Sequence, residues 1–160
     1  MNTTNASTDA LRMLFGLNYD VLKGNLEAIS HEESLIQPPG GGNCLNWVLG
    51  HIVATRDMAL ELLKQQPVWR KEEADTYRRG SAPIQDGSRA KNLDQIIADL
   101  HRSQDRLLAG LTEVLQPQLN APAGDQSVGE MLFTLQMHEA YHAGQTGLLR
   151  RMAGHEGAIK

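Results

Sequence analysis

The sequence predicts an all-α protein, a four-helix bundle with a long connection between its second and third helices. Four segments carry apolar residues at helical spacing, over about residues 9–30, 44–65, 92–115 and 127–153. Segments rich in proline, glycine and polar residues separate them, and no segment alternates like a strand. Four helices bury their apolar stripes most simply against one another, so we expect one domain over residues 1–160.

The first helix is expected to start at Ser7 or Thr8, because either side chain can cap it. The segment that follows it, HEESLIQPPGGG, contains Pro38 and Pro39 before three glycines. Such a run opposes regular structure. We therefore expect a turn that leads into a capped helix start at Asn43.

The second helix, about residues 44–65, is apolar on most sides, which is typical of a central helix. His51 lies inside this apolar run, on the same face as Trp47. Cys44 is the only cysteine, so the chain has no internal disulfide framework. That usage agrees with a reducing, cytoplasmic setting, and we expect Cys44 to be a small core residue.

A connection of about 26 residues, 66–91, follows this helix and is long for a compact domain. It carries Trp69 and Tyr77, which argue against plain disorder, with a short helix expected before Tyr77 and two cations, Arg78 and Arg79, after it. The segment could cover a site, with Arg78 pairing a carboxylate of a substrate or thiol cofactor. A solvated irregular connection is the alternative.

The last two helices have clear start and stop signals. Asn92 with Gln95, and Ser127 with Glu130, match the reciprocal capping pattern in which a cap residue precedes Glu or Gln by three positions. Gly154 is expected to end the last helix.

Two histidines, His138 and His142, lie four residues apart on an otherwise apolar face of the last helix. At this spacing their rings project to the same side about one turn apart. Neutral imidazole is a common ligand of zinc and nickel, so the pair indicates a divalent-metal site. Two independently hydrogen-bonded core histidines are the alternative.

We favour His51 as the third ligand because it is the only other histidine inside an apolar helical run. His31 and His155 are expected to be solvated, and His101 to lie on a helix surface. Gly50 beside His51, and Gly144 near His142, each cost about 1 kcal/mol against alanine in a helix. They therefore suggest close helix packing or room for a ligand.

The string HEAYH also matches the zinc-protease pattern HExxH, in which Glu139 would be the general base. The downstream candidates for a third protease ligand are His155 and Glu156, beyond Gly154 in a tail. No strand is predicted that could hold a peptide substrate. We rank the protease interpretation below the bundle metal site.

Composition excludes several function classes. The net charge is −4 and no run of Lys and Arg exceeds two residues, which opposes binding to nucleic acid or acidic membranes. No apolar run approaches the roughly 20 residues of a membrane span. The first ten residues, MNTTNASTDA, lack the features of a secretory signal, so we expect a cytoplasmic protein.

Two segments resemble one known family. Leu49-Gly50-His51-Ile52 in the second helix, and H-x-x-x-H-x-G-Q from His138 to Gln145 followed by Arg150-Arg151, look like the DinB/YfiT-like metalloenzymes of the DinB superfamily. The resemblance spans nearly the whole chain in helix order and loop placement. It implies an up-down-down-up bundle, often a homodimer, with nickel, zinc or another divalent metal on three histidines, which match His51, His138 and His142.

The resemblance further implies an enzyme acting on a small molecule. Some relatives use a low-molecular-weight thiol for S-transfer or isomerisation, and others are metal-dependent hydrolases. We favour the thiol-dependent class because no acid is clearly placed as a base on the metal face, and we consider Gln145 and Tyr141 as further cofactor contacts. A non-catalytic metal-binding or small-molecule-binding stress protein is the rival from another class.

Overall fold

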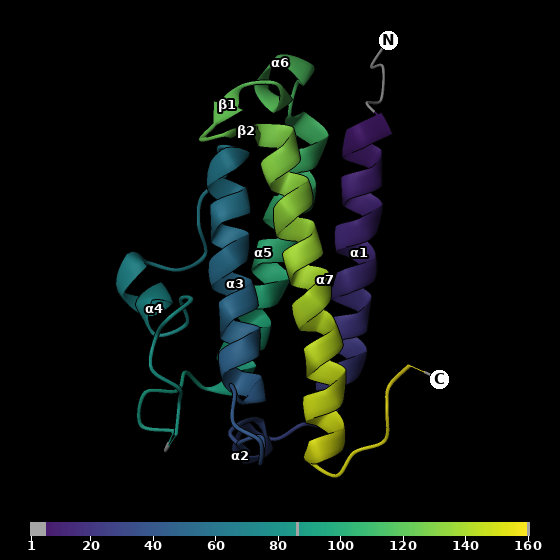
Figure 1. The fold of residues 1–160 in the computed structure, drawn as a ribbon. Helices are drawn as coiled ribbons and strands as arrows, with labels where there is room; N and C mark the ends of the chain where they lie inside the picture. Colours follow the sequence, from purple (N-terminus) through teal and green to yellow (C-terminus); the bar gives the residue numbers. More distant parts are fainter. Residues whose placement is uncertain (1–5, 86, 160) are drawn as a thin grey trace.

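The computed structural model describes residues 6–85 and 87–159, and in it four long helices pack as a bundle (Figure 1). These helices are α1 (Ala6–Leu26), α3 (Leu45–Leu62), α5 (Leu93–Glu113) and α7 (Val128–Met152). Three short helices lie in the connections: α2 (His31–Ser34), α4 (Lys71–Asp75) and α6 (Gln116–Leu119). A two-stranded antiparallel hairpin, β1 (Pro122–Ala123) and β2 (Gln126–Ser127), precedes α7. The prediction of an all-α bundle is confirmed.

The bundle has the up-down-down-up order. Both α1 and α3 pack against α5 and α7, so the four helices form a square. Asn46 bonds to Lys91 just before α5 starts, and Gln65 bonds to Glu113 where α5 ends, so α3 and α5 run parallel. The long connection returns along the outside of α3, where Figure 1 shows α4 standing beside that helix.

The interior consists of two apolar clusters with a polar layer between them. One cluster includes Leu22, Trp47 and Leu100, and the other includes Phe15, Leu60 and Leu107. Between them, each long helix contributes a buried polar side chain at the same height: Asn18, Arg56, Ser103 and Glu139. The histidines of α7 lie at this level as well.

Several helix starts differ from those predicted. Helix α1 already includes Ser7 and Thr8, so these residues lie inside it. The segment after α1 is not free of regular structure, because a capping box of Ser30 and Glu33 starts α2 before the prolines. Helix α3 starts after Cys44 without a side-chain cap.

The predicted signals for the later helices are mostly confirmed. Ser127 and Glu130 form the capping box of α7, and Gly154 follows the helix with φ 91°. Asn92 caps α5 by accepting from the amide of Asp94, and Gln95 takes no part in the cap. The hairpin of four paired residues is too short to show alternation in the sequence. Among the described residues, no helix has the length and apolar character of a membrane span.

Candidate metal centre

Three imidazoles from two helices meet in the polar layer. Nε2 of His138 lies 3.2 Å from Nε2 of His51 and 3.1 Å from Nε2 of His142. The three potential ligand atoms all lie within 4.8 Å of one another. Two nitrogens held at about 2.0–2.1 Å by one tetrahedral zinc ion lie roughly 3.3 Å apart. The two distances from His138 match this separation, so the cluster is compatible with a single metal ion.

The hydrogen bonds of the second ring nitrogens orient two of the three histidines. Nδ1 of His51 donates to the Tyr77 carbonyl at 2.7 Å, and Nδ1 of His142 donates to the Gln145 amide oxygen at 2.6 Å. Because these oxygens only accept, both Nε2 atoms present lone pairs. Neutral His138 has a single ring proton, so it cannot donate a hydrogen bond to both of these lone pairs at once. The three rings therefore suit a cation placed between them.

All three rings are held in the neutral form. Burial lowers the pKa of His51 to about 4. Burial also lowers the pKa of His142. The pKa of His138 is lowered by burial first, and then by the electrostatic cost of a second proton beside His142 and Arg79. Neutral imidazole is the form that binds metal, so proton competition at the site is weak near neutral pH.

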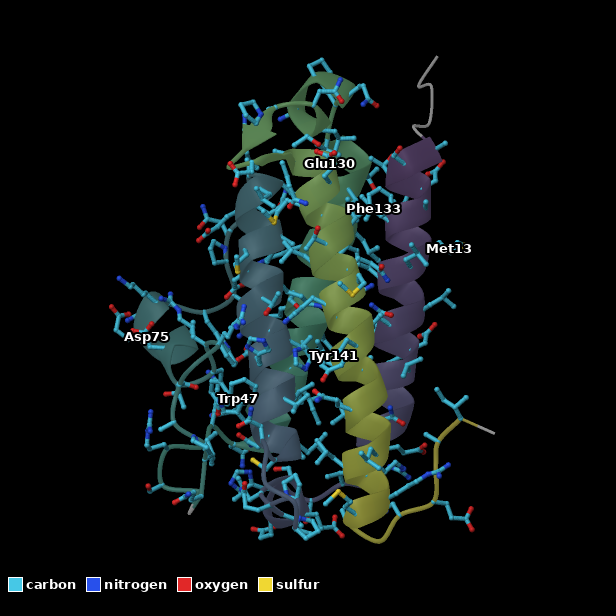
Figure 2. The ribbon with its side chains drawn as sticks, in the orientation of Figure 1. Met13, Trp47, Asp75, Glu130, Phe133 and Tyr141 are labelled. Carbon is cyan, nitrogen blue, oxygen red and sulfur yellow. The ribbon has the colours of Figure 1, made fainter. Side chains whose placement is uncertain are left out.

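His51 is fixed on a second side by Trp47, whose ring stacks on it with centroids 4.8 Å apart and planes 16° apart. The indole Nε1 donates to Ser81 Oγ, and Ser81 Oγ donates to the Thr76 carbonyl. The stacked pair thus connects α3 to the segment that follows α4. In Figure 2, Trp47 on α3 and Tyr141 on α7 mark the two helices that carry the site.

Gln145 and Tyr141 occupy different surroundings. Gln145 accepts from His142, and its amide nitrogen is 3.4 Å from the Tyr141 hydroxyl. Tyr141 is 64% exposed, with its ring edge against His142 at a centroid distance of 5.1 Å. Gln145 is therefore a partner of a ligand, while Tyr141 lies at the outer edge of the site.

Glu139, the base of the alternative protease interpretation, points away from the histidines. It is buried and forms a two-fold ion pair with Arg56 of α3, with N–O distances of 2.7 and 2.8 Å. Arg56 also donates to Ser103 Oγ and to the Leu100 carbonyl of α5. The HExxH spacing is thus present without its catalytic geometry, and Glu139 is a structural residue of the polar layer.

A cavity of about 830 Å³ opens beside His51 and His138, between α3, α7 and the segment around α4. Apolar side chains line part of it, including Ala54, Met58 and Leu135. Its charged lining comprises two acids and four cations: Asp57, Glu61, Arg70, Lys71, Arg78 and Arg79. The long connection is therefore one wall of this cavity and not a solvated irregular loop.

The charged residues of this wall differ in what they contact. Arg78, the cation named from the sequence, is exposed and pairs with Asp75 at 3.1 Å. Arg79 acts on His138 through its charge. Asp57 accepts from the amides of Val68 and Trp69 at 2.6 and 3.0 Å, which ties the start of the connection to α3.

The chain matches a known protein-family model. The model of the DinB superfamily aligns with residues 15–146, which include the three histidines and most of the bundle. The chain belongs to the DinB superfamily. A comparison with curated proteins finds no match for this DinB superfamily member.

The other histidines of this DinB superfamily protein lie away from the three-histidine cluster. His101 is exposed and contacts the Tyr19 hydroxyl, as expected for a surface position. His31 accepts from the amide of Leu93, and His155 lies 3.0 Å from a carboxylate oxygen of Glu33, so neither is simply solvated as predicted. Both bonds join segments far apart in the chain, which the sequence does not reveal.

Two parts of the site were not predicted from the sequence. The Tyr77 carbonyl is a backbone group, and no residue identity signals it. Arg56 is a cation in the middle of a largely apolar helix, and this placement was the available signal that a buried acid such as Glu139 pairs with it.

Proposed function

We propose that this protein is a metal-dependent enzyme in which His51, His138 and His142 hold one divalent ion, with a small thiol as the second reactant. The convergence of the three Nε2 atoms, with His51 and His138 lining a cavity, carries this proposal. Imidazole ligands suit nickel and zinc. Three protein ligands with open positions are typical of catalytic rather than closed structural sites.

A divalent ion bound there would lower the pKa of a coordinated water or deprotonate a coordinated thiol outright. The residues of the chain orient the ligands through Tyr77 and Gln145 and leave one side of the histidines open to the cavity. The apolar lining around Met58 and Leu135 would exclude water from a bound ligand.

The surrounding acids favour the thiol over the water. Glu139 is bound by Arg56, and Asp57 is bound by two backbone amides. Glu61 lines the cavity, but its position ten residues along α3 from His51 corresponds to roughly 15 Å of helix axis. A hydrolase needs a base near its water, whereas a thiolate needs none. Thiol-dependent S-transfer or isomerisation is therefore our preferred reaction.

The cations on the cavity wall support a ligand that carries a carboxylate. A carboxylate binds Arg by charge-assisted hydrogen bonds, which are strong in a partly dry site. Arg79 is better placed than Arg78 to bind this carboxylate, because Arg78 already pairs with Asp75. Arg79→Gln should raise the KM for an acidic thiol several-fold, and Arg78→Gln should change it less.

The first experiment is elemental analysis of protein purified without an affinity tag. We expect about one nickel or zinc ion per chain in the wild type and a large loss in His142→Ala. His101→Ala, which removes an exposed histidine, is the matched control and should keep its metal. Wild-type protein that takes up no divalent metal after supplementation would contradict the proposal.

The second experiment compares reactions on metal-loaded protein. Conjugation of an aryl halide is measured with glutathione, bacillithiol and mycothiol, beside hydrolysis of nitrophenyl esters and anilides. Metal-dependent consumption of one thiol supports the transferase. Hydrolysis without thiol would instead assign a hydrolase, and metal uptake without either reaction would favour a non-catalytic binding protein.

A further inference from the structure

We propose that Tyr77 is a positioning residue for His51, seated on Gly50 so that docking of the segment after α4 sets the affinity of the site for metal. This inference rests on the proposed metal site. Tyr77 touches no reactant and acts through the ligand ring. Four contacts join this segment to α3.

The first contact is the bond from His51 Nδ1 to the Tyr77 carbonyl, which joins residues 26 apart in the chain. It places the proton on Nδ1 and directs the Nε2 lone pair toward His138 and His142. Groups that orient a metal-binding histidine in this way typically change metal affinity about 10–100-fold when removed.

The second contact explains the glycine beside His51. The Tyr77 ring is 2% exposed and lies directly on the backbone of Gly50. A Cβ atom at position 50 would lie 2.6 Å from Cγ of Tyr77, closer than such atoms approach in proteins. The glycine therefore permits the approach that brings the Tyr77 carbonyl to His51.

The third contact joins the Tyr77 hydroxyl to Asn46, and the fourth joins the Trp47 indole to Ser81. The Tyr77 hydroxyl donates to Asn46 Oδ1 at 3.1 Å and accepts from the Lys91 amide at 2.7 Å. The Trp47 indole, stacked on His51, donates to Ser81 Oγ at 2.9 Å. The segment is thus anchored on both sides of its bond to the ligand ring.

The same segment supplies Arg78 and Arg79 to the cavity wall. Because one docked conformation both orients His51 and shapes this wall, metal binding and docking stabilise each other by linkage. Loss of docking should weaken metal binding, and bound metal should make the segment more rigid.

The chain offers a matched pair of glycines to test this. Gly50 and Gly144 both lie within helices, next to and two residues from ligand histidines. A Cβ atom at position 144 meets nothing within 4 Å, whereas one at position 50 meets the Tyr77 ring. Both changes to alanine raise helix propensity, so only the displacement of Tyr77 distinguishes them.

We expect Gly50→Ala to raise the zinc dissociation constant about 10–100-fold and to change the visible spectrum of the cobalt-substituted protein. The zinc dissociation constant of Gly144→Ala should stay within about two-fold of the wild-type value, because this change displaces no group that orients a histidine. Tyr77→Phe keeps the ring and the carbonyl and should bind zinc more tightly than Tyr77→Ala. Circular dichroism restricts the comparison to folded protein.

Wild-type zinc affinity and cobalt spectrum in folded Gly50→Ala would overturn the inference, as would an equal loss in Gly144→Ala. Hydrogen exchange gives a test without any variant. Zinc should slow exchange in residues 71–81 of the wild type, and unchanged exchange there would also overturn the inference. Wild-type protein that binds no metal would instead overturn the proposed function.

Discussion

At the scale of single residues, the partner of each second ring nitrogen determines what a histidine can do. His51 and His142 have acceptors for their Nδ1 protons. Nδ1 of His138 is buried and has no hydrogen-bond partner within the described chain. The orientation of the His138 ring therefore depends on its neighbours, whereas hydrogen bonds to Tyr77 and Gln145 orient His51 and His142.

Gln145→Leu tests this dependence. The change removes the acceptor of His142 while keeping a side chain of similar size, so zinc affinity should fall about 10–100-fold. Competition with a chromogenic chelator measures it. Tyr141→Phe removes only a hydroxyl at the outer edge and serves as control. Wild-type affinity in Gln145→Leu would show that the bond does not orient the ligand.

Residue-level prediction succeeded where helix geometry alone decides the outcome. The spacing of His138 and His142 brings their rings together on any regular helix, and burial of His51 followed from its apolar neighbours. The role of Tyr77 depends on a backbone oxygen and on the path of a long connection. Neither leaves a local pattern in the sequence.

At the scale of helices, α3 and α7 are joined by both the histidines and the ion pair of Arg56 and Glu139. Both charged side chains are nearly inaccessible, at 1% and 3% exposure. The pair lies between two apolar clusters and also bonds to α5. This ion pair therefore fixes how α3, α5 and α7 align in the polar layer beside the three histidines.

Glu139→Gln should lower the free energy of unfolding by about 3–5 kcal/mol, because it leaves the Arg56 charge buried without its partner. Urea unfolding of metal-free protein measures the loss. Replacing both partners with apolar residues, Arg56→Met with Glu139→Leu, should recover most of it. Unchanged stability with abolished turnover in Glu139→Gln would instead revive the protease interpretation.

The helix starts show why element boundaries were predicted less well than element identities. The Ser30–Glu33 capping box was present in the sequence, but the prolines and glycines after it pointed to a turn. Helix α3 starts without a side-chain cap, so no cap residue signals its first turn. The apolar periodicity of the long helices is a stronger signal because it extends over several turns.

At the scale of the whole molecule, helices α1 and α7 present exposed apolar side chains on adjacent surfaces. Figure 2 shows Met13 on α1 with Phe133 and Tyr141 on α7. Leu17 and Met137 continue this surface, at 55% and 61% exposure. A group of exposed apolar side chains on neighbouring helices is a candidate interaction site. The homodimer expected from the family resemblance stays a prediction, and this surface is its candidate interface.

The dimer prediction can be tested by light scattering after size exclusion. The wild type should have twice the chain mass of 17.6 kDa, about 35 kDa. Met137→Glu should shift it toward the monomer, because a charge would be buried in the interface. Leu115→Glu, at a site 65% exposed beyond α5, is the control. A monomeric wild type, or a dimeric Met137→Glu, would exclude this interface.

The distance of 87 residues between His51 and His138 has a consequence for biosynthesis. At a translation rate of about 5–20 residues per second, the ribosome makes the second donor roughly 4–17 s after the first. A nascent chain that has just passed residue 51 thus contains His51 but not yet His138 and His142. Binding of the proposed metal by all three histidines would therefore be a late event in maturation, after α7 has been synthesised.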